Sequence, residues 1–469
     1  MWYDSVEGIE MLTSVLFGIV ITIIYYLLPR AHRKTLLFIS SAFFYLALDR
    51  KMFLILLITG VWIWWCALYL KPGKKSLVTE LLPLVFVLMF FKYNQFFISE
   101  AAKLLGRIGL ETSVHTLSLI MPLGISYYTF KSISYLVDVY KGTIKVEKNP
   151  LDILLYISFF PEITSGPISR YDRFRTALEK GMVYSEYNIQ TGAYLIIKGL
   201  FMKAVIANRL VDYVDKIFST PGAYPGLAMW LGMFFFTVQL YCDFAGYSFI
   251  AIGITQLLGL HIQENFNRPY LAAGINEFWE RWHISLSSWL RDYIYFPLGG
   301  SRGSKARTKI NLLIVFVVCA IWHGQGLHYI IWGIYHGFLC IISRQKKQER
   351  LRPLHAFMTF WLISFGWLFF RVETVKTALI YLSNMFLDLS LSVESIQNAV
   401  LPLSGDNTCV AYFLVIMFFI IVLFAREIYE EKKNISAHSP ASFSWQVFLL
   451  VSILLFGSMR TSSFIYANF

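Results

Sequence analysis

Two histidines, His283 and His323, lie in or beside stretches of the chain that are apolar enough to sit at membrane depth. An imidazole titrates near neutral pH, so it can accept and return a proton under physiological conditions. In hydrocarbon it also needs a hydrogen-bond partner, because an unsatisfied polar group is costly there. Both histidines are therefore candidate functional residues. The alternative is a core histidine whose hydrogen bonds are satisfied inside the protein.

His323 stands between two apolar runs, Ile310 to Trp322 and Tyr329 to Ile342, and glycines follow it at Gly324 and Gly326. The first run is too short to cross a hydrocarbon core comfortably at a rise of about 1.5 Å per residue. This predicts a broken hairpin with a flexible, glycine-flanked histidine at its apex. The depth, the glycines and two further histidines nearby (His328 and His336) favour a reaction centre.

The residues on both sides of His283 are spaced as in an amphipathic helix. Aromatic and small residues recur every three or four positions, which predicts one helix from about residue 276 to Pro297, where Pro-Leu-Gly-Gly ends it. Charged residues fill the remaining face, so this helix should not span. It should lie along the interface or line the mouth of a cavity.

Composition sets the class. Of 469 residues, 57% are hydrophobic and only 15% are charged, which indicates an all-α polytopic membrane protein. The net charge of +12 would suggest nucleic-acid binding in a soluble chain, but here the basic residues sit in short loops between apolar runs. We expect no nucleic-acid partner. Five cysteines are scattered singly, so neither a disulfide framework nor a metal site is expected.

Residues 1–10 contain no Lys or Arg, and the apolar run from Met11 to Leu28 lacks a signal-peptide start and cleavage site, so we expect a retained anchor. The positive-inside rule then predicts a multi-pass protein of the cytoplasmic or inner membrane with both termini extracytoplasmic. The basic segments expected in the cytoplasm are Arg30–Lys34, Lys71–Lys75, Lys141–Lys148, Arg302–Lys309 and Arg344–Arg352.

Polar residues also interrupt other apolar segments. Lys131 and Asp138 share a predicted helix face, where holding helices together is favoured over chemistry. The proline- and glycine-containing stretch 161–170 predicts a re-entrant or interfacial loop, with an ordinary surface loop as the alternative. Gln239 and Asp243 are spaced i, i+4, and structural bonding and site function remain equally open for them.

Several motifs together resemble the membrane-bound O-acyltransferase family, in particular its bacterial branch that contains the alginate O-acetyltransferase membrane subunit. The similarity covers most of the chain and rests on residues 165–167, 243–248, 265–270, 277–293, 297–302 and 322–324.

The resemblance implies a single membrane domain over residues 1–469, with about 10–13 membrane helices and re-entrant segments around a central tunnel. Its parts would be N-terminal helices (1–150), a catalytic core (151–345) and C-terminal helices (346–469). The family's catalytic histidine falls on His323 and its second motif position on His283. Candidates for lining the substrate path are Trp282, Ser285, Trp289, Arg291, Asp292, Trp322, Asp243 and Gln239.

The implied reaction starts from an acyl thioester, acetyl-CoA in the first instance, that approaches from the cytoplasm, where basic loops attract its phosphates. His323 would be the general base for a hydroxyl, while His283 would orient the thioester or stabilise the oxyanion. No bound cofactor is expected. The resemblance also implies membrane lipid, an extracytoplasmic SGNH-type partner and a polysaccharide acceptor such as alginate or another exopolysaccharide of the cell envelope. Three alternatives remain: D-alanyl transfer to teichoic acid, peptidoglycan O-acetylation and, from another class, a polytopic transporter.

Overall fold

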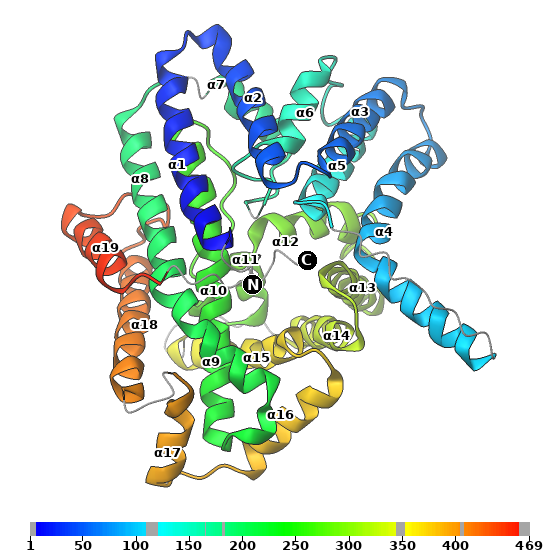
Figure 1. Cartoon of the computed structure of the whole chain (residues 1–469). Coiled ribbons are helices and arrows are strands. Elements are labelled where there is room, and N and C mark those ends of the chain that lie inside the picture. Colours follow the sequence, from blue (N-terminus) through cyan, green and yellow to red (C-terminus); the bar gives the residue numbers. More distant parts are fainter. Residues whose placement is uncertain are drawn as a thin grey trace. The chain divides into compact units, whose positions relative to one another are not determined.

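The computed structural model describes residues 6–108, 121–164, 166–180, 183–343, 352–403 and 408–458. Helices make up the regular structure of these residues, and no strand occurs among them (Figure 1). The expected all-α class is thereby confirmed. The described residues fall into two compact units: unit 1 is drawn from Met1–Gly18, Ser185–Leu257 and Glu264–Asn468, and unit 2 mainly from Ile19–Tyr184.

Among the described residues, five helices are long and apolar enough to cross a membrane: α4 (Lys74–Arg107), α10 (Gly226–Leu257), α13 (Lys305–His323), α15 (Arg352–Arg371) and α18 (Cys409–Lys432). Shorter apolar helices accompany them at Met11–Leu27, Phe53–Tyr69, Leu327–Ile342, Val375–Leu387 and Phe443–Phe456. This confirms a multi-pass membrane protein. The expectation that the run before His323 is too short to span was wrong, because α13 begins five residues earlier, at Lys305, inside the basic loop. Long basic side chains in a first turn can reach the interface while their helix continues into hydrocarbon.

Unit 2 contains α2 to α7, and α1 (Val6–Leu27) continues into it from unit 1. The bounds are α2 (Arg30–Leu48), α3 (Phe53–Tyr69), α4 (Lys74–Arg107), α5 (Ile125–Tyr140), α6 (Pro150–Ser158) and α7 (Tyr171–Lys180). The stretch 161–170 packs inside this unit, and Ser165 of its predicted motif lies outside the described residues.

A buried ion pair fastens that stretch to α5. Lys131 pairs with Glu162 at 2.5 Å, and Ser169 donates to the same carboxylate at 2.6 Å. Glu162 is only 1% exposed, so the surface-loop alternative for residues 161–170 is wrong. Lys131 therefore holds structure together, as favoured, but through Glu162, a partner that spacing along one helix did not reveal.

Unit 1 is arranged around α10 (Gly226–Leu257), a single helix of 32 residues that contacts α8, α9, α15 and α16 (Figure 1). Glycines permit its approach to α8, since a Cβ on Gly199 would lie 2.5 Å from the carbonyl oxygen of Gly246. The remaining helices are α8 (Glu186–Leu200), η1 (Phe201–Ala207), α9 (Asn208–Ser219), α11 (Ile275–Arg281), α12 (Ile284–Leu290), η4 (Arg291–Tyr295), α13 (Lys305–His323), α14 (Leu327–Ile342), α15 (Arg352–Arg371), α16 (Val375–Leu387), α17 (Val393–Val400), α18 (Cys409–Lys432) and α19 (Phe443–Phe456).

A π-helix, η1, lies between α8 and α9. Its Ala204 carbonyl accepts a hydrogen bond from the backbone N–H of Ser458 at 2.9 Å, which ties the end of the described chain to this turn. The same turn carries Lys203, whose ammonium pairs with Asp243 on α10. Both side chains are buried, so the charge on Asp243 is balanced inside unit 1.

Candidate functional site

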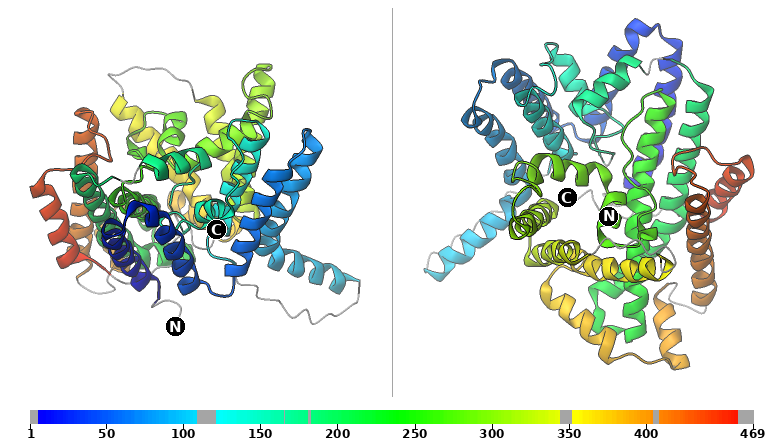
Figure 2. Two further views of the ribbon diagram at one scale, coloured as in Figure 1. Left: turned by 90° about the horizontal axis from the view of Figure 1, so that it is seen from above. Right: turned by 180° about the vertical axis from the view of Figure 1, so that it is seen from behind.

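His323 is the last residue of α13 and is 3% exposed. The predicted hairpin is present: α13 and α14 pack side by side, and α15 packs against α14 (Figure 2). Gly326, at φ 118°, adopts a conformation that favours glycine and starts α14. His323 itself belongs to the helix rather than to a flexible linker. Its ring contacts those of Trp322, Trp332 and Phe370, with centroids 4.6, 5.2 and 5.1 Å away.

The helix predicted through His283 is broken there, so the prediction of one continuous helix was wrong. His283 has φ 43° and ψ 53° in the left-handed region, and it lies between α11 and α12. The preceding loop supplies the backbone bonds that a continuous helix would make. Asn267 N–H donates to the carbonyl of Arg281 at 3.0 Å, and Ile284 N–H donates to that of Asn265 at 2.9 Å. The apolar spacing persists across the break, which is why the sequence conceals it.

Asn265 holds His283 in place. Its side-chain Oδ1 accepts from the backbone N–H of Ser285 at 3.3 Å, from the Ser285 hydroxyl at 2.8 Å and from His283 Nδ1 at 3.0 Å. Its Nδ2 donates to Ser248 at 3.0 Å. Because a backbone N–H can only donate, the amide oxygen must face His283. His283 therefore donates from Nδ1, and its Nε2 carries a lone pair.

Burial lowers the pKa of His283 to about 3, so the ring is neutral at physiological pH. Its Nε2 has no hydrogen-bond partner among the described residues. The Phe244 ring packs edge-on against the imidazole at 4.7 Å. A neutral imidazole with a buried lone pair can accept a hydrogen bond or a proton from a group that reaches it.

Aromatic rings connect the two predicted histidines within unit 1. From His283 the contacts run through Phe266 to Trp282, with ring centroids 6.4 and 5.1 Å apart. Trp282 then packs against Trp367 at 5.0 Å. Trp332 completes the path, because its ring centroid lies 6.0 Å from that of Trp367 and 5.2 Å from that of His323. Both histidines thus lie in one continuous aromatic cluster.

The other predicted site residues divide into two groups. Trp282 and Ser285 adjoin His283, and Trp322 adjoins His323, so the structure brings these to the histidines. Trp289 of α12 packs on Tyr293 of η4, and Arg291 is exposed and paired with its neighbour Asp292 at 3.1 Å. Buried Gln239 and Asp243 lie on α10, where Asp243 pairs with Lys203. Asn265 and Ser248 were missed as site residues, although both lie within segments that carry the family resemblance.

Among the described residues, no group of three or more His, Cys, Asp or Glu side chains could hold a metal ion. The five cysteines are buried and free.

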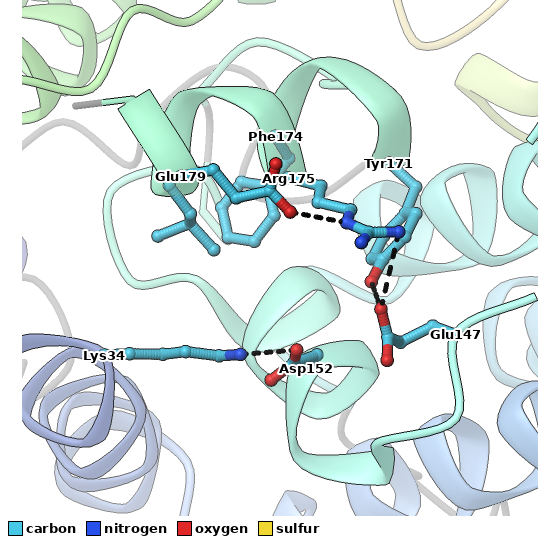
Figure 3. A pocket seen from close by; sticks show the side chains of 8 residues that line it. Lys34, Glu147, Asp152, Tyr171, Phe174, Arg175 and Glu179 are labelled. Atoms are coloured by element: carbon cyan, nitrogen blue, oxygen red, sulfur yellow. Dashed lines mark hydrogen bonds and ion pairs between the residues drawn. The ribbon is translucent and has the colours of Figure 1, made fainter. Parts of the chain in front are cut away.

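Unit 2 contains a cavity of about 210 Å³ at the ends of α2 and α6 and along α7 (Figure 3). Lys34 pairs with Asp152 there, Arg175 with Glu179 at 2.8 Å, and Tyr171 donates to Glu147 at 2.8 Å. Burial opposes ionisation of Glu147, but hydrogen bonds from the Asn149 backbone and Tyr171, with the Arg175 charge, outweigh it and lower its pKa. The lining residues are Lys34, Glu147, Asp152, Tyr171, Phe174, Arg175, Leu178 and Glu179.

This cavity combines three carboxylates with two cations that are already paired, so it is poorly suited to a polyanionic coenzyme. Sequence reasoning missed it because its residues come from three separate segments that share no motif.

Comparison with known proteins identifies relatives. Residues 145–364 match the MBOAT, membrane-bound O-acyltransferase family. The chain is 35% identical to the probable alginate O-acetylase AlgI of Pseudomonas aeruginosa over 441 residues, covering 90% of this chain and 82% of the relative. It is 33% identical over 406 residues to the peptidoglycan O-acetyltransferase of Helicobacter pylori (77% and 76% covered). It is 35% identical over 276 residues to the teichoic acid D-alanyltransferase of Bacillus subtilis (54% and 69% covered).

Proposed function

Because this chain belongs to the membrane-bound O-acyltransferase family, we propose that it transfers an acetyl group from acetyl-CoA for O-acetylation of an extracytoplasmic polysaccharide. The observation that supports acetyl over D-alanyl is the extent of similarity. The alginate O-acetylase of Pseudomonas aeruginosa matches 90% of the chain, whereas the D-alanyltransferase of Bacillus subtilis matches 54%. Alginate is the first acceptor to examine and peptidoglycan the second, since relatives named for both cover most of the chain.

In this proposal His323 is the general base. Its burial at the end of α13, among the rings of Trp322, Trp332 and Phe370, excludes water from the proton transfer. A positioned base of this kind typically contributes a factor of about 10² to 10⁴.

His283 orients a substrate group. With Nδ1 donating to Asn265, its Nε2 accepts a hydrogen bond from a hydroxyl or an amide N–H. The alternative role, oxyanion stabilisation, needs a donor at Nε2 and hence a protonated ring, which burial of His283 disfavours. The geometry therefore supports orientation.

The donor approaches from the cytoplasm. The exposed basic residues from Arg302 to Lys309 are placed to attract its phosphates, while most of the second basic segment, Arg344–Arg352, lies outside the described residues. The acetyl group is transferred to an extracytoplasmic SGNH-type partner, and this partner then transfers it to the glycan.

The test compares ester-linked acetate and D-alanine on envelope and secreted glycans from cells carrying the native protein or His323→Ala. His32→Ala, an exposed histidine on α2, is the matched control. We expect His323→Ala to remove acetate from one polymer and His32→Ala to keep it, at equal protein levels. Loss of D-alanine instead supports the teichoic acid reaction. No change in either modification contradicts acyl transfer and favours a transporter.

A further inference from the structure

Three side chains form a cluster of rings, and one of them contacts His323. Trp279 comes from α11, and Trp332 and His336 come from α14. The ring centroid of His336 lies 5.2 Å from that of Trp279 and 5.2 Å from that of Trp332, and the centroids of the two indoles are 6.0 Å apart. Trp332 and His336 are each 0% exposed. The same Trp332 ring packs on His323 at 5.2 Å, so the cluster adjoins the proposed base.

Every side-chain nitrogen of this cluster lacks a hydrogen-bond partner among the described residues. These atoms are Trp279 Nε1, Trp332 Nε1, His336 Nδ1 and His336 Nε2. Buried polar groups are nearly always hydrogen-bonded, and a site with several exceptions calls for an explanation. An all-carbon ring such as Phe would fill the His336 position without the cost of desolvating two nitrogens.

The fold also makes specific room for this imidazole. Gly366 on α15 faces it, and a Cβ at that position would lie 2.1 Å from His336 Nε2. Any larger residue there would displace the ring. His336 therefore fits against α15 because residue 366 has no side chain.

The chemistry of the unpartnered atoms indicates what they bind. An indole N–H only donates, and a neutral imidazole has one donor and one acceptor, so the cluster offers three donors and one acceptor. An excess of neutral donors suits an oxygen that gains negative charge, and such donors act most strongly where water is excluded. His283, with its lone pair at Nε2, does not supply this function.

We propose that Trp279, Trp332 and His336 form a donor pocket that binds the carbonyl oxygen of the acyl thioester during transfer. This inference rests on the proposed acyltransferase function and assigns its oxyanion-stabilising groups. The acceptor hydroxyl oxygen bonds to the acyl carbon as its proton moves to His323. The carbonyl π pair moves onto the oxygen held by the pocket. When the C=O bond re-forms, the C–S bond breaks, and the thiolate leaves and takes the proton from His323.

His336→Phe is the central variant, because it keeps a ring of similar size and removes both nitrogens. Membranes from cells that lack the native protein and carry each variant at equal levels supply the natural acceptor and partner. Initial rates of thiol release over a range of acetyl-CoA concentrations give kcat and KM, and thermal unfolding of the purified protein gives Tm. We expect His336→Phe to lower kcat by about 10²-fold with KM changed less than about threefold, and to raise Tm because buried unpartnered atoms are gone.

Tyr335→Phe is the matched control. It removes a polar atom from the neighbouring residue of α14, but one that is partnered, since the hydroxyl donates to the carbonyl of Leu362 at 2.9 Å. We expect the opposite pattern, a lower Tm with kcat retained. Gly366→Ala keeps every donor but displaces His336, so it should lower kcat as well.

If His336→Phe retains the native kcat, the donor pocket is overturned. If Tm also falls while kcat is unchanged, the His336 ring has a structural role only. Failure of the proposed function is distinguishable, because thiol release would then be the same in the native protein and in His323→Ala.

Discussion

The hydrogen bonds around Asn265 decide what His283 can do in the site. The side-chain oxygen of Asn265 accepts hydrogen bonds from His283 Nδ1 and from the backbone N–H and hydroxyl of Ser285. This fixes the tautomer of His283. The family resemblance assigned His283 to the site but left its role open between orienting the thioester and stabilising an oxyanion. The orientation of one buried amide separates these roles, because it determines whether Nε2 donates or accepts.

Asn265→Asp tests this arrangement through pH. The carboxylate still accepts from His283 and Ser285, but its charge favours imidazolium, so the pKa of His283 rises from about 3. A raised pKa means that His283 takes up a proton as the pH falls through a range where the native ring stays neutral. Protonation of His283 should then lower the activity of this variant at acidic pH. The measurement is the rate of thiol release between about pH 5 and 9.

Asn267→Asp adds the same charge in the same loop, at a residue whose Oδ1 has no hydrogen-bond partner among the described residues. Its profile should match that of the native protein. Identical profiles for all three proteins would contradict the assigned tautomer.

At the scale of elements, buried ion pairs connect segments that the sequence presents separately. The π-helix η1 brings Lys203 to Asp243 on α10, and α5 brings Lys131 to Glu162 in the stretch before α7. Within each pair, the two buried charges balance one another. This supports the structural alternative for Asp243, which the sequence left equal with site function.

Removing one partner at a time distinguishes the two roles of Asp243. Lys203→Met removes the ammonium that pairs with the buried carboxylate of Asp243 and should cost about 3 to 5 kcal/mol, measured by thermal unfolding in detergent. The double variant Lys203→Met, Asp243→Leu removes both charges of this pair and should recover most of that loss.

If Asp243 is structural, the double variant also keeps glycan acetylation. A double variant that is stable but inactive would instead assign Asp243 to the site.

At the scale of the whole molecule, the distribution of basic loops predicts sidedness. Ser301 stands in the basic loop before α13, and Ser390 stands between α16 and α17. Both are exposed, while the five native cysteines are buried and should give little background. The positive-inside rule puts Ser301 in the cytoplasm and Ser390 outside.

Labelling of Ser301→Cys and Ser390→Cys with a membrane-impermeant maleimide tests this topology. In intact cells with a permeable outer layer, Ser390→Cys should react and Ser301→Cys should react only after lysis. The reverse pattern would invert the topology and place the donor's entry on the other face.

Several properties were determined by the sequence alone because they depend on local composition and on contiguous motifs. The all-α membrane class, the hairpin at His323 and the family all follow from apolar runs and short segments. The helix boundaries inside polar loops did not, as at Lys305, where charged residues continue α13.

Tertiary structure alone decided the features that join residues far apart in the chain. The break at His283 depends on backbone bonds from the loop at Asn265 and Asn267. The partner of Lys131 is Glu162, 31 positions away, and that of Lys203 is Asp243, 40 positions away. The unpartnered nitrogens around His336 are likewise visible only once α11, α14 and α15 are packed together. The spacing of apolar residues shows which face of a helix is apolar. It does not show which other element packs against that face.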